Sequence, residues 1–407
     1  MGGSLYGRVL AVREVRRAVL LGLVVRVPLW ASNVVLTLHV VTHLGRSYAE
    51  SGLLVAVATV TLAASGPWRG RRIDRVGLRA SLAPCLVVLA TCWSIAPFVG
   101  YWPLLVLAAV AGLFEVPTFT IVRQSLMHSV PDDLRRTALS IDSVAVEISF
   151  MIGPVIGVLL ATTVPTSWAL FGCEFASIAG GVAIWIQNPV VRDNSVERPA
   201  RKPARTWLGR RVIAVLLAAG AATVVLGGCD VAIVAALRHL HHQPWIGWVL
   251  AVWGLGSAVG GLVYGALHRA LPVFPLLGLL GATTIPVALA GGPLMLAVLL
   301  FVTGVFCAPT ITATVDALSR IVPDAVRGEA LGWHGSAMTA GAALGAPLAG
   351  VAIDTVSWRG GFVAPGVLGL AVTVIGLLLY RLRDRGSTAY VALPPQERRV
   401  VEAVREL

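Results

Sequence analysis

Residues 130–139 read VPDDLRRTAL, and residues 322–331 read VPDAVRGEAL. The two segments agree at six of ten positions at an offset of 192 residues, and the same offset aligns the Pro-Thr pair at 117–118 with the pair at 309–310. A shared apolar composition does not explain agreement within a polar segment, so we interpret it as an internal repeat. The two halves of the chain are therefore expected to fold into similar units.

The chain around this repeat is too apolar for a soluble protein. Of its 407 residues 57% are hydrophobic and 13% charged, with a mean hydropathy of +0.83, which excludes a large soluble catalytic domain. A helix needs about 20 apolar residues to cross a bilayer. Apolar runs predict twelve such helices, at residues 18–41, 52–68, 80–99, 102–122, 138–162, 168–185, 212–237, 245–267, 273–290, 293–315, 330–354 and 361–380.

A polar linker at residues 186–211, with seven basic residues, divides these helices into six and six. The sequence thus predicts an all-α polytopic membrane protein with twelve transmembrane helices in two pseudo-symmetric six-helix bundles, an architecture that secondary transporters use. The expected parts are an N-terminal segment at 1–17, a bundle at 18–185, the linker, a second bundle at 212–380 and a tail at 381–407.

Lysine and arginine are distributed unevenly between the two faces. Twenty-eight of 32 lie on the side of both termini and the linker, whereas the opposite loops hold only Arg46, Arg238 and Arg359, and Arg26 lies inside the first helix. Because cytoplasmic loops retain basic residues, we predict that both termini are cytoplasmic, in the cell (plasma or inner) membrane. These bases punctuate apolar runs, so they do not indicate binding to nucleic acid.

The segment between the second and third predicted helices, residues 70–79, reads GRRIDRVGLR. Asp74 is expected near the start of the third helix, where the positive helix end favours a carboxylate, and Gly77 permits a tight turn. With Gly70, Asp74, Arg75, Gly77 and Arg79 in place, the chain resembles the major facilitator superfamily, whose signature after helix 2 is Gly-x-x-x-Asp-Arg/Lys-x-Gly-x-Arg/Lys.

This resemblance covers residues 18–380 and implies transport by alternating access. It implies that helices 1, 4, 7 and 10 line a central cavity, and that Asp74 belongs to a charge network that latches the halves closed on the cytoplasmic side. The alternative is that the arginines of this loop only enforce topology.

The fifth helix contains Gly153, Pro154 and Gly157, which resemble the core of a motif in exporter branches of this superfamily. At an offset of 193, Pro154 and Gly157 recur as Pro347 and Gly350. Serine and valine replace glycine at two other positions of the fuller motif, so the resemblance to exporters is partial.

The fourth helix has only Leu-Ala-Ala-Val at 107–110, where proton antiporters of this superfamily carry a buried arginine. Arg123 is assigned to the loop that follows the helix. This departure argues against a conventional proton antiport site.

Charged side chains inside the spans are costly and usually functional. At 1.5 Å per residue, Arg26, Glu115 and Glu147 are all expected roughly 12 Å from the cytoplasmic end. One hypothesis is that Arg26 neutralises one glutamate and leaves the other, with Asp142 slightly shallower, free to titrate. The alternative is a static ion pair that fixes helix packing. Glu174 is expected to be peripheral.

Asp230 lies in the seventh helix, which the resemblance assigns to the cavity, and no basic residue shares its expected depth. It could exchange a proton or bind a cationic substrate, or it could be hydrogen-bonded to a neighbouring helix. Asp230 is the strongest candidate for coupling.

We therefore expect a monomeric secondary transporter for a small organic, hydrophobic or amphiphilic solute, working in efflux and coupled to protons. The alternatives are a proton-coupled importer of a small metabolite and a polytopic membrane enzyme. No loop carries a paired-Asp metal motif, and the five cysteines lie within predicted spans without ligand spacing. No metal, cofactor or enzymatic activity is therefore expected.

Overall fold

The computed structural model describes residues 5–190, 207–267, 269 and 271–381, and this part of the chain is helical without strands. Eleven segments are long and apolar enough to cross a membrane, and the shorter apolar segment Val273–Leu289 lies between two of them. The predicted fold of twelve helices in two bundles is confirmed. Most of the expected linker and nearly all of the expected tail lie outside the described residues.

The first bundle follows the predicted order of six spans. Its helices are α1 (Leu5–Ala11), α2 (Arg13–Leu38) with the π-helical turn η1 (His39–His43), α3 (Tyr48–Val76), α4 (Leu78–Ile95) with η2 (Ala96–Phe98), α5 (Tyr101–Phe114), α6 (Thr118–Ser129), α7 (Arg135–Thr163) and α8 (Thr166–Gln187).

The second bundle repeats this order. Its helices are α10 (Arg210–His239), η3 (Gln243–Trp245), α11 (Ile246–Ala266), α12 (Val273–Thr284) with η4 (Ile285–Leu289), α13 (Pro293–Gly304), α14 (Cys307–Ile321), η5 (Asp324–Val326), α15 (Arg327–Thr355) and α16 (Gly360–Arg381).

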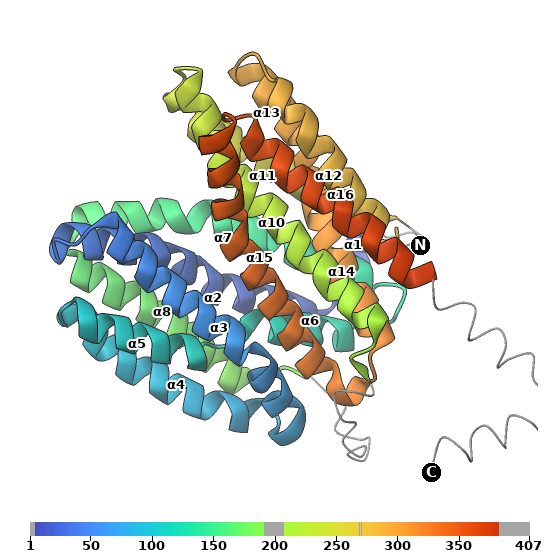
Figure 1. The fold of residues 1–407 in the computed structure, drawn as a ribbon. Coiled ribbons are helices and arrows are strands. Elements are labelled where there is room, and N and C mark those ends of the chain that lie inside the picture. The colour runs from blue at the N-terminus through green and yellow to red at the C-terminus, as the bar shows by residue number, and fades with distance from the viewer. Residues whose placement is uncertain (1–4, 191–206, 268, 270, 382–407) are drawn as a thin grey trace, which may run out of the picture.

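The two bundles meet through α3 against α15 and α7 against α11. We call the end at which α8 ends and α10 begins the linker end. The two groups of helices converge there, near α6 and α14, and splay apart toward the opposite end (Figure 1). The hydrogen bonds that join them lie along the linker-end halves of these four helices.

The fourth and tenth spans are interrupted helices, whereas the sequence predicts continuous ones. The fourth breaks between α5 and α6 at residues 115–117, and the tenth between α13 and α14 at 305–306. Pro117 has no N–H to continue α5 and disfavours helical backbone at Val116. The breaks occupy similar places in the two halves, next to the repeated Pro-Thr pairs.

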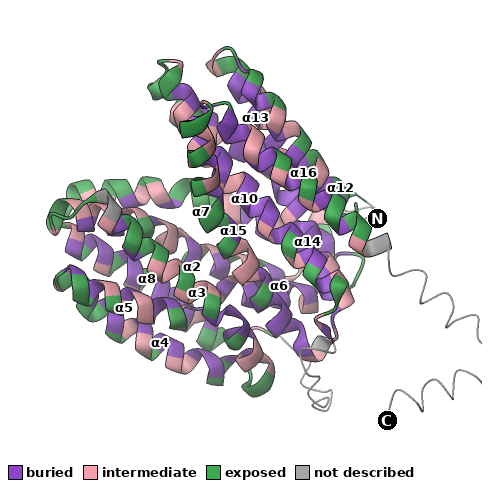
Figure 2. Ribbon diagram, in the orientation of Figure 1, coloured by how far each residue is buried: buried purple, intermediate pink, exposed green. Residues whose placement is uncertain are grey.

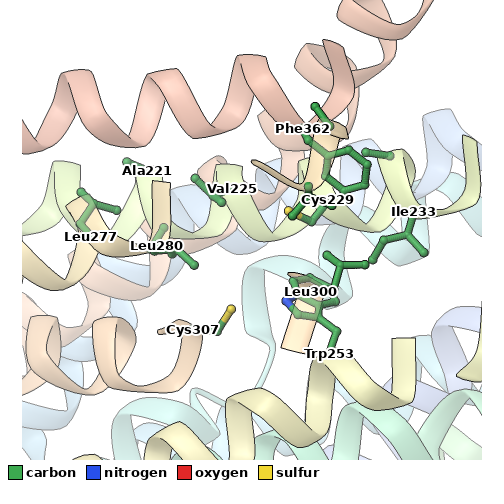
Figure 3. Close-up of a cluster of buried hydrophobic side chains, with 14 of the residues drawn as sticks. Ala221, Val225, Cys229, Ile233, Trp253, Leu277, Leu280, Leu300, Cys307 and Phe362 are labelled. Atoms are coloured by element: carbon green, nitrogen blue, oxygen red, sulfur yellow. The ribbon is translucent and has the colours of Figure 1, made fainter. Parts of the chain in front are cut away.

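Each bundle has its own apolar core. The core of the second surrounds α10, which is buried over much of its length (Figure 2). Cys229 and Ile233 of α10 pack there with Trp253 of α11, Leu300 of α13 and Phe362 of α16 (Figure 3). This packing fixes α10, and with it Asp230, next to the seam between the bundles.

Small residues set the closest helix contacts inside each bundle. A Cβ on Gly153 or Gly157 would lie against the backbone of α2, so α7 can approach α2 only with glycine at these positions. In the second bundle Gly341 and Gly345 make the equivalent contact between α15 and α10.

Of the predicted counterparts of the fifth-helix motif, Pro347 lies within α15 as Pro154 lies within α7. Gly350 does not make the close contact that Gly157 makes, because a Cβ on Gly350 would meet open space. The contact follows the Gly-x-x-x-Gly spacing shared by 153–157 and 341–345, because that spacing puts both glycines on one helix face.

Candidate functional site

Asp74 joins the two bundles at the linker end. Its Oδ1 accepts the N–H of Gly328 at 3.1 Å and its Oδ2 accepts the N–H of Glu329 at 2.8 Å. Both donors lie in the first turn of α15, where backbone N–H groups lack intrahelical partners and the helix dipole favours an anion. The carboxylate therefore caps a helix of the other half.

This position corrects the prediction from sequence. Asp74 lies inside α3, which continues to Val76, and not at the start of the third span. The expected interaction between a carboxylate and a helix N-terminus is present, but the helix belongs to the second bundle. Sequence proximity pointed to α4, because α15 comes beside α3 only through tertiary packing.

The contact around Asp74 is tight and charged. A Cβ on Gly70 would overlap the carbonyl group of Gly328, so this glycine permits the close approach of α3 and α15. Arg71 Nη2 lies 2.5 Å from Glu329 Oε1. About two turns further from the linker end, Ser336 donates to the carbonyl oxygen of Ala63 at 2.5 Å.

The remaining residues of the loop motif face other partners. Gly77 has φ +85° and ψ 170°, a conformation that favours glycine, and it separates α3 from α4. Arg79 donates to the carbonyl oxygens of Trp185 and Ile186 at 3.1 and 2.8 Å, at the end of α8. Arg75 is exposed. Only Gly70 and Asp74 of the predicted motif residues reach the second bundle.

A second seam joins α7 to α11 and α14. Thr137 donates to the carbonyl oxygen of Gly265 at 2.6 Å, and Ser143 and Thr312 hydroxyls are 2.8 Å apart. Tyr6 of α1, which sequence reasoning missed, donates to the carbonyl oxygen of Leu262. Burial raises the pKa of Tyr6 to about 12, so its hydroxyl stays a donor at neutral pH.

Arg26 pairs with Asp142 and not with either glutamate, which corrects the expected pairing. Its Nη1 lies 2.7 Å from Asp142 Oδ1, and both side chains are fully buried. Arg123 Nε lies 3.4 Å from Asp142 Oδ2. Both guanidinium groups also lie over the ring of Phe119, at 4.5 and 5.7 Å from its centroid.

Arg123 is therefore a buried residue of α6, only 5% exposed, and not a loop residue as predicted. The apolar run 102–122 hid this, since it ends one residue before Arg123 and α6 continues to Ser129. Residues 124–129 carry no charge and contain no helix-breaking residue, and this feature of the sequence could have shown that the helix continues past Arg123.

Glu115 lies in the break of the fourth span, away from Arg26. Its carboxylate accepts the N–H of Val116 at 3.2 Å, and its carbonyl oxygen accepts a hydrogen bond from Arg69 Nη1. Glu174 of α8, predicted to be peripheral, is buried and lies within electrostatic range of Glu115. These two acids form a group within the first bundle.

Glu147 and Asp230 approach each other from different bundles. Glu147 Oε1 accepts a hydrogen bond from the Ser257 hydroxyl of α11 at 2.7 Å, and it lies within electrostatic range of Asp230 on α10. Cys307, at the start of α14, lies within range of both acids. Sequence analysis proposed each acid separately but did not place them together.

The described residues contain no group of three histidine, cysteine, aspartate or glutamate side chains arranged to hold a metal ion. The seams and buried charges belong to an all-helical membrane protein with two bundles that pack at one end and separate at the other. That class is the membrane transporter built from two repeated bundles.

The sequence model of the Major Facilitator Superfamily matches residues 18–243 and 230–407, which together span nearly the whole chain. The chain belongs to this superfamily. It is a multi-pass membrane transporter and not an enzyme. A search of curated protein sequences found no match.

Solved structures of the same fold come from transporters with different substrates. A bacterial homologue of the iron transporter ferroportin, in an outward-facing state, gives a TM-score of 0.72 at 13% identity over 90% of this chain and 98% of that chain. The E. coli fucose:proton symporter FucP gives 0.67 at 13%, over 90% and 99%. The human organic anion transporter MFSD10 (TETRAN) gives 0.66 at 14%, over 90% and 99%.

Proposed function

We propose that this chain exports a small hydrophobic or amphiphilic organic solute by alternating access, coupled to protons. The observation that carries the proposal is the pair of carboxylates Glu147 and Asp230, one from each bundle, at the seam between them. Two nearby carboxylates repel each other when both are ionised, so the pair favours a state that holds a proton or a cation.

The linker end is cytoplasmic in this proposal. Basic residues cluster at that end, and cytoplasmic loops retain them. The convergence of the bundles at the linker end then corresponds to an outward-facing state, with Asp74 and Glu147 on the two closed seams. The similarity to a ferroportin homologue in an outward-facing state supports this assignment.

Closure of the opposite end requires the linker end to open. The Asp74 contact with α15 and the Glu147 contact with Ser257 must then break, because each joins one bundle to the other. Glu147 thus changes partners in every cycle, and Asp230 is an acid of the other bundle within electrostatic range with which it can share a proton. In this proposal the proton-coupling residue Glu147 therefore lies on the α7–α11 seam that opens and closes in each cycle.

The proposed substrate is apolar because few polar side chains accompany these acids. α10 and α11 carry mainly aliphatic residues, glycine and tryptophan, whereas a sugar site needs many hydrogen-bond partners. Arg26 and Asp142 are assigned to packing, since they form a fully buried ion pair inside the first bundle.

Purified protein in liposomes with an imposed proton gradient tests the proposal against a panel of amphiphilic compounds. We expect solute movement opposite to the proton flux, and we expect Asp230→Asn to abolish its dependence on the gradient. Asp354→Asn is the matched control, because Asp354 is exposed near the opposite end of α15.

Transport that ignores the gradient in the unmodified protein would overturn proton coupling. Solute movement in the same direction as the protons would overturn export in favour of import. Equal loss of coupling in the Asp230 and Asp354 variants would overturn the role of Asp230.

A further inference from the structure

The short helix α1 precedes the first membrane span and is packed against the first bundle. Val12, with extended backbone at φ −71° and ψ 119°, separates α1 from α2. Leu5, Val9 and Val12 recur at the spacing of one helix face, and they pack into an apolar cluster with residues of α2, α6 and α7. Val9 is fully buried in this cluster. The first bundle therefore carries α1.

Polar contacts also hold α1 to the first bundle. Arg16 of α2 donates through Nη1 to the carbonyl oxygens of Leu10 and Ala11, at 2.7 and 3.2 Å. These carbonyls belong to the last turn of α1, where they lack intrahelical partners and where the helix dipole favours a cation. Arg8 Nη2 lies 3.7 Å from Asp133 Oδ2, in the segment after α6. The position of α1 is thus fixed by the first bundle from more than one side.

Tyr6 reaches from α1 to the second bundle. Its hydroxyl donates to the carbonyl oxygen of Leu262 on α11. A Cβ on Gly265 would lie 2.5 Å from the hydroxyl oxygen, so Tyr6 docks where α11 has no side chain. Ser140 of α7 lies against the same glycine, and Thr137 of α7 donates to its carbonyl oxygen. Tyr6 therefore lies at the linker end of the α7–α11 seam.

We propose that α1 is a strap that holds the linker end closed, with the Tyr6 hydroxyl as its attachment to the second bundle. Because the first bundle carries α1, the hydroxyl must leave Leu262 when the bundles separate at this end. The hydrogen bond therefore stabilises only the closed linker end. One ordinary intramolecular hydrogen bond changes an equilibrium about fivefold.

Tyr6 is in this sense a positioning residue, which biases the transport cycle without contact with the solute or with the coupling acids. The strap requires only that the linker end opens in the cycle. It does not depend on the identity of the solute, on the direction of transport or on proton coupling.

Distances between spin labels test the strap in the full-length protein. Val76→Cys on α3 and Ile213→Cys on α10 carry the labels, since both positions are exposed at the linker end and belong to different bundles. Tyr6→Phe keeps the ring and removes the hydroxyl, and it should lower the ratio of closed to open linker end about fivefold. Tyr101→Phe is the matched control and should leave this ratio unchanged, because its hydroxyl donates to the carbonyl oxygen of Glu50 inside the first bundle, at 2.8 Å.

Two further variants test the attachment of α1 to the first bundle. Arg16→Gln removes the charged donor from the end of α1 and should lower the ratio of closed to open linker end about threefold. Arg17→Gln is its control and should leave the ratio unchanged, because Arg17 is the adjacent exposed arginine of α2 and carries the same charge. Deletion of residues 2–11 should lower the ratio at least as far as Tyr6→Phe does. The melting temperature in detergent shows whether each variant folds.

Unchanged distance distributions in Tyr6→Phe and in the truncated chain would overturn the strap. An equal change in Tyr6→Phe and Tyr101→Phe would also overturn it, because the Tyr101 hydrogen bond does not join the two bundles. Opening by the deletion but not by Tyr6→Phe would overturn the role of the hydroxyl, and equal effects of Arg16→Gln and Arg17→Gln would overturn the attachment through Arg16. The distances are measured without solute and without a proton gradient, so these outcomes are independent of whether the chain exports a solute.

Discussion

Replacement of Asp74 by asparagine should open the linker end. The substitution keeps the size of the side chain but removes its charge and one of its two acceptor oxygens. The asparagine side chain could accept from Gly328 or from Glu329, but its amide NH₂ group would face the other backbone N–H, which leaves that donor unpaired. The seam between α3 and α15 then loses one of the two hydrogen bonds from the N-terminus of α15, together with the favourable interaction of a negative charge with that helix end.

The magnitude follows from the two hydrogen bonds of 3.1 and 2.8 Å. A hydrogen bond to a charged group contributes about 1.5–3 kcal/mol, and a partly buried charge at a helix end contributes up to about 2 kcal/mol. These overlap, because the same carboxylate makes both interactions, so we expect a loss of roughly 2–3 kcal/mol. The ratio of closed to open linker end should fall about 30- to 150-fold.

Spin labels on Val76→Cys and Leu267→Cys measure this change directly. Both positions are exposed at the linker end, one at the end of α3 and the other just after α11, and the described native cysteines are all buried. The distance distribution should gain a longer component in Asp74→Asn. In Arg71→Gln the gain should be small, since a partly exposed ion pair contributes only about 1 kcal/mol.

Identical distance distributions in Asp74→Asn and in the unmodified sequence would refute this reasoning. The same is true if Arg71→Gln opened the linker end as far as Asp74→Asn does, because the helix N-terminus would then contribute nothing beyond a surface charge.

Two further substitutions test the packing at the linker end. Gly70→Ala should reduce the transport rate at least tenfold, since its Cβ would overlap the backbone of α15. Gly172→Ala is the control and should leave the transport rate unchanged, because a Cβ at this position of α8 meets open space. Equal transport rates in the two variants would contradict the argument that α3 and α15 need glycine for their close approach. Asp142→Asn should destabilise the protein by about 3–5 kcal/mol, because it leaves two buried arginines without their counter-charge. Thermal unfolding in detergent measures this, and an unchanged melting temperature would show that the ion pair has no structural role.

The number and order of the membrane helices could be read from the sequence because lipid imposes a local rule. Each segment that crosses a bilayer must be apolar and must satisfy its own backbone hydrogen bonds. The repeat at 130–139 and 322–331 likewise lies in the sequence itself. The breaks at 115–117 and 305–306 were missed, because apolarity alone does not distinguish a continuous helix from one interrupted at a proline.

The buried charges could be identified from the sequence, but their partners could not. Arg26 and Asp142 are 116 residues apart, and depth estimates placed Arg26 equally well beside Glu115 or Glu147. The choice depends on the rotation of each helix about its axis, which side-chain packing sets. Arg123 was not recognised as part of this group for a different reason: the apolar run ends one residue before it, although α6 continues to Ser129.

The sequence by itself determined that the chain is a two-bundle membrane transporter, through apolar length, the distribution of arginine and a loop motif. Only the tertiary structure decided that Asp74 caps α15, that Arg26 pairs with Asp142, and that Glu147 of the first bundle accepts a hydrogen bond from Ser257 of the second. Hydropathy is a property of each segment taken alone. Contacts between helices depend on which faces meet and at what height, and that is settled only when all the helices pack together.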